Sequence, residues 1–276
     1  TGTNNMQAAN NPDTLPWKAY SEQVTKIVIA GQVTSICESA FSKMNNVTTV
    51  VISDKVTKID ARAFANCASL TSITIPASVT KIGDYAFVGC TSLPTVIFAE
   101  GSGLTTLGKT VFGYSGITSQ IIPSGIQTLE SNMFSECENL VSVTLPEGLE
   151  VISSGAFYDC INLKTLQLPS TITHIVLGAF DKCYGLESLA LYKLFDISDY
   201  FPDSTKLSTI TVCGNPESIS GFDWCTSLTN IIIPDSVTRI GNSAFKYCYE
   251  IYELKLPAQL ERIENEVRVV VRDWGA

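Results

Sequence analysis

A phenylalanine recurs along most of the chain at nearly constant intervals. Counted in sequence positions, the successive intervals are 23, 23, 25, 22, 23, 23, 21, 21 and 23. The series consists of Phe41, Phe64, Phe87, Phe112, Phe134, Phe157, Phe180, Phe201, Phe222 and Phe245. Fixed periods of roughly 20 to 29 residues are typical of solenoids, in which neighbouring coils bury the apolar face that one coil cannot bury alone. The period therefore predicts a stack of coils.

Other residues keep phase with this phenylalanine. A cysteine often follows three residues later, a leucine or a similar residue six later, and an apolar pair nine and eleven later, such as Ile73 and Ile75. This two-residue alternation predicts a short strand with both side chains inward, and the proline that often comes next, such as Pro76, ends it. The following apolar pair, such as Val79 and Ile82, has a spacing of three, which suits a turn, a 3-10 segment or a short helix.

Two stretches show the repeat most clearly. Residues 82–93 read Ile-Gly-Asp-Tyr-Ala-Phe-Val-Gly-Cys-Thr-Ser-Leu, and residues 240–248 read Ile-Gly-Asn-Ser-Ala-Phe-Lys-Tyr-Cys. This pattern resembles the BspA-like class of leucine-rich repeats over roughly residues 24 to 266. The resemblance implies a bacterial or protist protein, secreted or at the cell surface, that adheres to host proteins or to other cells and is not an enzyme.

The expected fold is a repeat solenoid, a right-handed leucine-rich-repeat coil. About eleven short parallel strands, from Ile27–Ile29 to Leu254–Leu256, are expected on a concave face, with turns, 3-10 segments or short helices on the convex side. We expect a polar N-terminal segment and cap over 1–23, the solenoid over 24–266, and a tail or end cap over 267–276. Because the chain starts at Thr1 without a signal peptide, we expect it to be a processed form or a fragment.

Charge and composition argue against several functions. The chain has 18 Lys plus Arg against 27 Asp plus Glu, a net charge of −9, which disfavours nucleic acid and anionic lipid. No run of about 18 apolar residues is present, so we expect no membrane insertion by this segment. The single histidine, His174, is expected in a solvated turn. We expect no catalytic residue, no cofactor and no metal.

The nine cysteines invite a disulfide interpretation, but their register favours another one. Seven of them occupy the same position in successive coils: Cys67, Cys90, Cys137, Cys160, Cys183, Cys225 and Cys248. Equivalent side chains point the same way about 4.8 Å apart, a poor geometry for a disulfide. We therefore expect a ladder of buried, reduced thiols. Cys37 and Cys213 lie off this ladder and are expected to be more reactive.

Three stretches break the repeat. Residues 99–125 combine a two-residue insertion with a coil that is one residue short, which is expected to form a surface loop. Residues 192–221 are interpreted as a drifted coil whose aromatic residues fill the core. The alternative is a recognition site that includes Tyr192, Phe195, Asp196, Asp199 and Tyr200. The third is the C-terminus, where Val267 and Arg268 replace the expected Ala-Phe.

The outward residues of the expected strands form a strip that is rich in serine and threonine. β-propensity alone explains such residues in strands, but solenoids also commonly bind ligands on this surface. The candidate binding residues are Thr49, Ser72, Thr74, Thr95, Ser142, Thr144, Thr165, Gln167, Thr209 and Thr211. The leading hypothesis is a module that binds an extracellular protein, such as a host matrix or cell-surface protein. The alternative is a glycan-binding or passive spacer segment of a larger surface protein.

Overall fold

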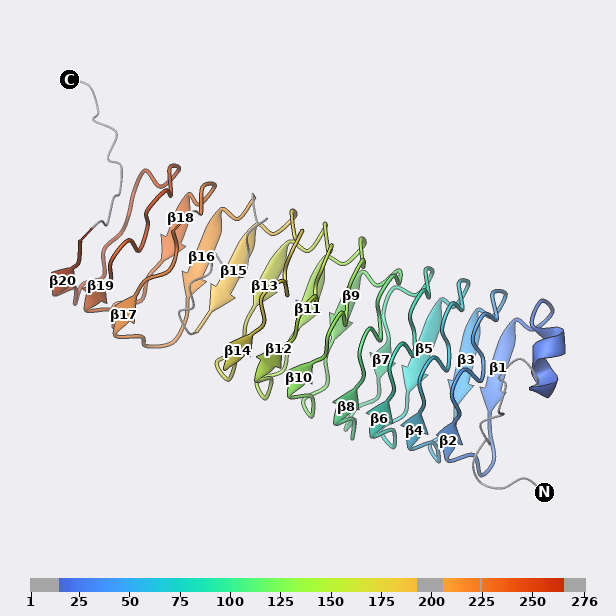
Figure 1. Ribbon diagram of the computed structural model, residues 1–276. Helices are drawn as coiled ribbons and strands as arrows, with labels where there is room; N and C mark the ends of the chain where they lie inside the picture. Colours follow the sequence, from blue (N-terminus) through green and yellow to red (C-terminus); the bar gives the residue numbers. More distant parts are fainter. Residues whose placement is uncertain (1–14, 193–205, 224, 266–276) are drawn as a thin grey trace.

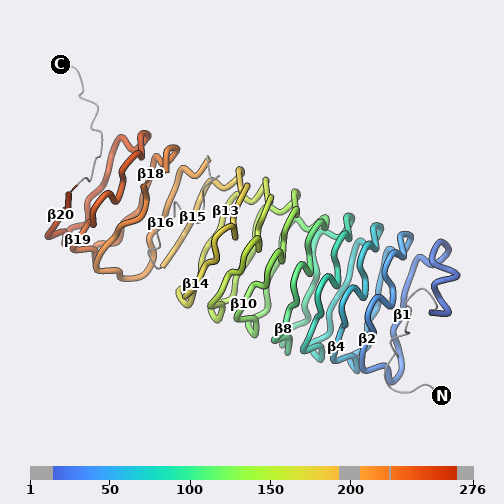
Figure 2. The backbone as a smooth tube through the Cα atoms, viewed as in Figure 1, coloured from blue at the N-terminus to red at the C-terminus, as the bar shows by residue number. Residues whose placement is uncertain are grey.

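The computed structural model describes residues 15–192, 206–223 and 225–265, which form a row of stacked coils (Figure 1). In each regular coil the chain passes through a strand of the main sheet, then a two-residue strand, and then a return segment that carries the recurring phenylalanine. The backbone trace repeats the same outline from coil to coil, with β1 (Lys26–Ile29) near one end and β20 (Arg262–Ile263) at the other (Figure 2). The predicted solenoid is confirmed.

The strands along the main sheet pair in parallel, and in regular coils each residue pairs with the residue 23 positions later, as Lys26 does with Thr49. The described residues contain ten such strands rather than the expected eleven, because the last coil, around Leu254–Leu256, does not join the ladder. They are β1, β3 (Thr49–Ile52), β5 (Ser72–Ile75), β7 (Ile97–Phe98), β9 (Ser119–Ile121), β11 (Ser142–Thr144), β13 (Thr165–Gln167), β15 (Ser188–Leu191), β16 (Thr209–Val212) and β18 (Asn230–Ile232).

A second ladder of two-residue strands occupies the place where turns, 3-10 segments or short helices were expected. Stacking brings equivalent segments to strand spacing, so their backbones pair, while Ile59 and Ile82 point into the core. In the described part of the chain the only helix is the 3-10 segment η2 (Pro16–Tyr20). The short strands are β2 (Ser35–Ile36), β4 (Lys58–Ile59), β6 (Lys81–Ile82), β8 (Thr106–Leu107), β10 (Thr128–Leu129), β12 (Val151–Ile152), β14 (His174–Ile175), β17 (Ser218–Ile219), β19 (Arg239–Ile240) and β20.

Within the described residues the recurring phenylalanines stack inside the coils, in one row from Phe41 to Phe180 and in a further pair, Phe222 and Phe245, whose centroids are 5.7 Å apart. From Phe41 to Phe180, successive ring centroids are 5.1 to 6.2 Å apart, and the planes of Phe64 and Phe87 differ by 1°. Trp17 of η2 extends the row beyond Phe41 at 5.6 Å, and its Nε1 donates to the carbonyl oxygen of Ala40 at 2.6 Å. The predicted aromatic core is confirmed, and Trp17 covers its first ring.

The return segments form a third hydrogen-bonded wall, although they are not strands. The amide groups of Phe64 and Asn66 donate to carbonyl oxygens of the next coil, at 2.9 and 2.7 Å. Asn66 adopts a left-handed conformation, with φ of 58°. The equivalent Gly89 also has a positive φ, 69°, and a Cβ there would lie 2.3 Å from Asn66 Oδ1. Glycine at 89 therefore suits both the backbone and the close packing.

Residues 99–125 interrupt both strand ladders at the same coil. The main sheet ends at β7 and resumes at β9, and the short-strand ladder ends at β8 and resumes at β10. Gln120, which is 3% exposed, takes the inward position and fills the interruption. Its Oε1 accepts from the Val96 amide and its Nε2 donates to the Val96 carbonyl oxygen, both at 2.9 Å. The expected simple loop is therefore also a break in the sheet, bridged by a buried carboxamide.

The second irregular stretch shortens one coil. β15 and β16 pair directly, with Ser188 opposite Thr209, so this coil is two positions shorter than a regular one. The short strand that would follow β15 in this coil falls among residues 193–205, which lie outside the described residues. Phe201 lies outside the described residues, as do 267–276, so the predicted C-terminal cap and the other domain boundaries stay predictions.

Candidate functional site

The outward side chains of the main sheet form two rows along the stack, because alternate residues of a strand point to opposite faces and parallel pairing keeps equivalent residues adjacent. We call this surface the sheet face. Its first row consists of Lys26, Thr49, Ser72, Thr95, Ser119, Ser142, Thr165, Ser188, Thr209 and Asn230. Its second row consists of Val28, Val51, Thr74, Ile97, Ile121, Thr144, Gln167, Ala190, Thr211 and Ile232.

All ten of the predicted strand-face binding residues lie on the sheet face. The exposed ones are Ser72, Thr74, Thr144, Thr165 and Gln167. The half-buried ones are Thr49, Thr95, Ser142, Thr209 and Thr211. Thr95 lies just before β7, and its Oγ1 is 3.4 Å from Gln120 Oε1, so part of its hydrogen-bonding capacity is already used.

The sheet face also carries branched apolar residues that the sequence analysis did not select. Their exposed fractions are 58% for Val28, 45% for Val51, 51% for Ile97, 68% for Ile121 and 52% for Ile232. The strand alternation already placed them outward, but the surrounding serines and threonines dominated the interpretation. The face is thus mixed, with hydroxyl groups beside exposed methyl groups, and contiguous exposed apolar surface is a common mark of an interaction site.

One hollow lies over three neighbouring strands of the six-stranded part of the sheet. It has a volume of about 560 Å³ and is lined from β11, β13 and β15 and from the turns that follow β11 and β13. Four predicted binding residues meet there: Ser142, Thr144, Thr165 and Gln167. Hydroxyl groups, a carboxamide and the Glu147 carboxylate surround apolar lining groups, so the hollow can bind a ligand with both polar and apolar parts.

A second hollow lies at the interruption between β7 and β9. It measures about 480 Å³, and Ile97, Phe98, Ile121 and Pro123 contribute to its lining. Its position follows from the missing ladder, since Gln120 bridges the inner side of the interruption and leaves the outer side open. This hollow is more apolar than the first one.

The aromatic and carboxylate site predicted at the irregular coil falls mostly outside the described residues. This holds for Phe195, Asp196, Asp199 and Tyr200. Tyr192 is half-buried, and a Cβ at Gly214 would lie 3.3 Å from its Cδ1. The described part therefore shows a packed tyrosine, and the recognition site stays a prediction.

The geometry of the thiols indicates a structural role. None of the nine cysteines, all of which the structure describes, forms a disulfide, and six ladder thiols lie 2.9 to 3.2 Å from a phenylalanine carbonyl oxygen of the preceding coil. Burial raises the pKa of Cys67 and of Cys137 to about 11. Burial also raises the pKa of Cys37 and of Cys213, so neither thiol is activated by a lowered pKa, and their higher reactivity relative to the ladder thiols stays a prediction.

Other groups with catalytic or ligand-binding potential are dispersed. His174 is exposed, and its Nδ1 lies 3.0 Å from Thr173 Oγ1. Across 15–192, 206–223 and 225–265, no group of three or more His, Cys, Asp and Glu side chains is placed to hold a metal ion. The same residues include no helix that is long and apolar enough to cross a membrane.

The comparisons with known proteins agree with this architecture. Residues 18–140, 105–221 and 218–267 match the family model "BspA type Leucine rich repeat region (6 copies)". Among curated proteins, none matches the chain.

The solved structures that match the chain come from several bacteria. A leucine-rich repeat protein from Bacteroides ovatus is 24% identical, with a TM-score of 0.57, and the match covers 88% of this chain and 75% of that one. A leucine-rich repeat protein from Eubacterium ventriosum is 20% identical, with a TM-score of 0.44, over 95% of this chain and 87% of that one. A leucine-rich cell surface protein from Faecalibacterium prausnitzii is 24% identical, with a TM-score of 0.42, over 85% and 79%. The first of these shows the fold of the stack.

Proposed function

Because this chain belongs to the BspA-type leucine-rich repeat family, we propose that it is a non-catalytic module that binds another protein through the sheet face. The proposal includes a location at the cell surface or outside the cell, and a role in adhesion to a host or neighbouring-cell protein. A protein rather than a small molecule suits a surface that extends over ten strands.

The exposed apolar residues of the sheet face carry this proposal. Ile97 and Ile121 are 51% and 68% exposed, and strand alternation points both side chains away from the core. A solvent-facing strand residue is usually polar, so branched apolar residues here favour a covered surface. The neighbouring hydroxyl groups add hydrogen-bonding capacity without charge, as in the polar part of many protein interfaces.

The proposal can be tested with the whole stack as bait in a host extracellular extract. In the test variant, arginine replaces Thr74, Thr144, Thr165 and Thr211, whose side chains point outward from four different strands. In the matched control, arginine replaces Asn45, Asn139, Ser154 and Asn242, which are exposed outside the sheet face. We expect the test variant to lose the captured protein and the control to retain it, with circular dichroism confirming that both fold.

Equal capture by the two variants would refute binding through the sheet face. A signal on a glycan array, without any protein partner, would favour the glycan-binding alternative. If neither a protein nor a glycan bound, the result would favour the alternative of a passive spacer segment.

A further inference from the structure

Glu147 is held at the border of the hollow that lies over β11, β13 and β15. It belongs to the turn after β11, and its Oε2 accepts from Ser170 Oγ at 3.3 Å and from the Ser170 amide at 3.4 Å. Ser170 occupies the corresponding turn of the next coil. The backbone carbonyl oxygen of Glu147 accepts from Thr171 Oγ1 at 2.5 Å. Two turns therefore fix the position of one carboxylate beside the hollow.

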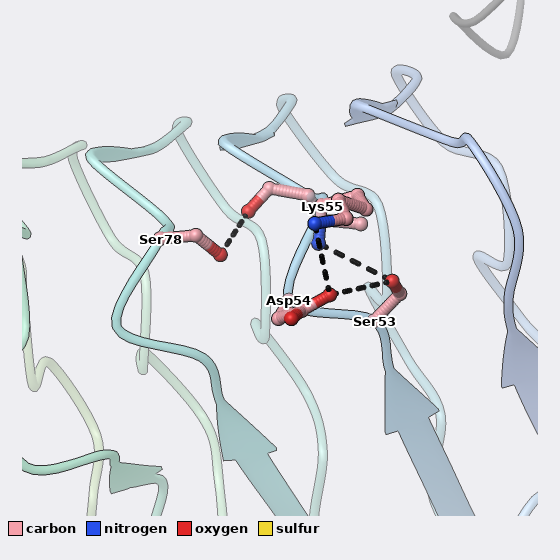
Figure 3. Close-up of polar contacts among 5 residues, drawn as sticks. Ser53, Asp54, Lys55 and Ser78 are labelled. Atoms are coloured by element: carbon pink, nitrogen blue, oxygen red, sulfur yellow. Dashed lines mark hydrogen bonds and ion pairs between the residues drawn. The ribbon is translucent and has the colours of Figure 1, made fainter.

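This carboxylate lacks a neutralising partner within the described residues, where no cationic group lies within 4.0 Å of it. The turn after β3 shows the contrast (Figure 3). There, Lys55 Nζ lies 4.0 Å from Asp54 Oδ1, and Ser53 Oγ is 3.4 Å from the same oxygen. A carboxylate at a similar turn thus has its own lysine, whereas the charge of Glu147 stays available to a ligand.

The coils around the hollow carry an excess of negative charge. Residues 130–190 contain eight Asp and Glu against two lysines. Lys182 lies 3.6 Å from Asp159, and Lys164 comes before β13, at the opposite end of the strand from the turn that holds Ser170. The local field therefore favours a positively charged ligand and disfavours a negatively charged one.

We propose that this hollow receives an extended segment of the protein partner that carries a lysine or an arginine, whose cationic group pairs with Glu147. The inference rests on the proposed function and names the chemistry of the partner. The aliphatic stem of the basic side chain packs on Leu145 and Pro169, and the Gln167 carboxamide with the neighbouring hydroxyl groups bonds to the peptide backbone of the segment.

The size of the hollow sets the length of the segment. Three strands at a spacing of about 4.8 Å span about 10 Å, which an extended peptide covers with about three residues. The recognised element is therefore short, and the rest of the sheet face contributes the remaining contacts with the partner.

The test uses the full chain and fluorescent peptides of the sequence Ser-Val-Lys-Val-Ser, with norleucine or glutamate in place of lysine. Binding is measured by fluorescence anisotropy at low and at high ionic strength. We expect the lysine peptide to bind about five- to tenfold more tightly than the norleucine peptide at low ionic strength. Glu147→Gln removes this difference, whereas Glu100→Gln, in the turn after β7, is the matched control and preserves it.

Equal affinity for the lysine and norleucine peptides, or an unchanged preference in the Glu147→Gln variant, would overturn the inference. If no peptide binds although the four-arginine variant of the sheet face loses its captured protein, the inference fails and the proposed function stands. If that variant retains its captured protein, the proposed function itself fails.

Discussion

The thiol of Cys160 donates a hydrogen bond to the carbonyl oxygen of Phe134 in the preceding coil, with a distance of 3.1 Å between sulfur and oxygen. The contact repeats in other coils, as between Cys90 and Phe64 at 3.2 Å. Each such thiol fills space in the core and is a second donor to a carbonyl oxygen that already accepts from a backbone amide, as that of Phe134 does from the Cys137 amide at 3.1 Å. This double role explains why cysteine, rather than alanine or valine, recurs three residues after the phenylalanine.

Replacing Cys160 with alanine is expected to lower the free energy of unfolding by about 1–2 kcal/mol, because it leaves a small cavity and removes one of the two hydrogen bonds to the buried Phe134 carbonyl oxygen. Cys160→Ser keeps a donor at this position and should lose less. Urea unfolding followed by circular dichroism measures both. Cys213→Ala, at a half-buried position, is the control and should change stability little. A Cys160→Ala variant as stable as the parent would contradict the structural role of the thiol.

Stability should fall in alkaline solution. The pKa of Cys67 and of Cys137 rises from 9.0 to about 11 on folding, because burial disfavours the thiolate. Above pH 9 the unfolded chain releases protons that the folded chain retains, so unfolding becomes easier, by up to about 1.4 kcal/mol per pH unit for each such thiol. Below pH 9 these groups contribute no pH dependence. The measurement is the urea midpoint of unfolding as a function of pH between 8 and 11, for the parent and for the Cys67→Ala variant. If the two midpoints fell equally with pH, Cys67 would make no contribution to the alkaline loss of stability.

Gln120→Met should destabilise the chain by about 2–4 kcal/mol, because methionine has a similar size but leaves the Val96 amide and carbonyl groups without their partner. Gln167→Met is the matched control, since Gln167 is exposed on the sheet face and its replacement should cost less than about 0.5 kcal/mol. Chemical denaturation of both variants measures the two changes in the free energy of unfolding. Equal stability would mean that the carboxamide is not needed at the interruption.

Phe157→Ala should cost about 3–5 kcal/mol, as expected for a large aromatic side chain removed from a closed core. Phe157 is fully buried, with ring neighbours at 5.4 and 5.1 Å. Phe41→Ala should cost less, since Phe41 is 6% exposed and lies near the end of the row. Thermal and urea unfolding of the two variants measure the loss of stability in each. A larger loss in Phe41→Ala than in Phe157→Ala would contradict the prediction.

The core could be predicted because its signal repeats. Phe64 and Phe87 are one period apart in the sequence, and one period is the length of one coil. Their rings therefore stack in neighbouring coils, with centroids 5.6 Å apart. The second ladder could not be predicted in this way. A strand of two residues, such as Lys81–Ile82, is too short to show an alternation, and it pairs only because stacking has already placed its neighbours at strand spacing.

The residues that form the two rows of the sheet face could be predicted, because alternation in strands decides which residues point outward. Its hollows were not, because they depend on how turns from different coils meet. The interaction between Glu147 and Ser170 joins two successive coils, and no local pattern marks it. Gln120 did carry a signal, as a polar residue in an inward position that is usually apolar. Its role as a bridge depends on the interruption around it.

The coincident interruption of both strand ladders has a mechanical consequence. Between the coil of β7 and the coil of β9, the return segments keep their regular bonds, such as that from the Phe112 amide to the Met133 carbonyl oxygen at 3.0 Å, while the strand walls do not. A force that pulled the two ends of the stack apart would therefore act mainly on the return-segment bonds and on the Gln120 bridge at this interruption. The coils before and after the interruption would then separate from each other before either block of paired strands came apart.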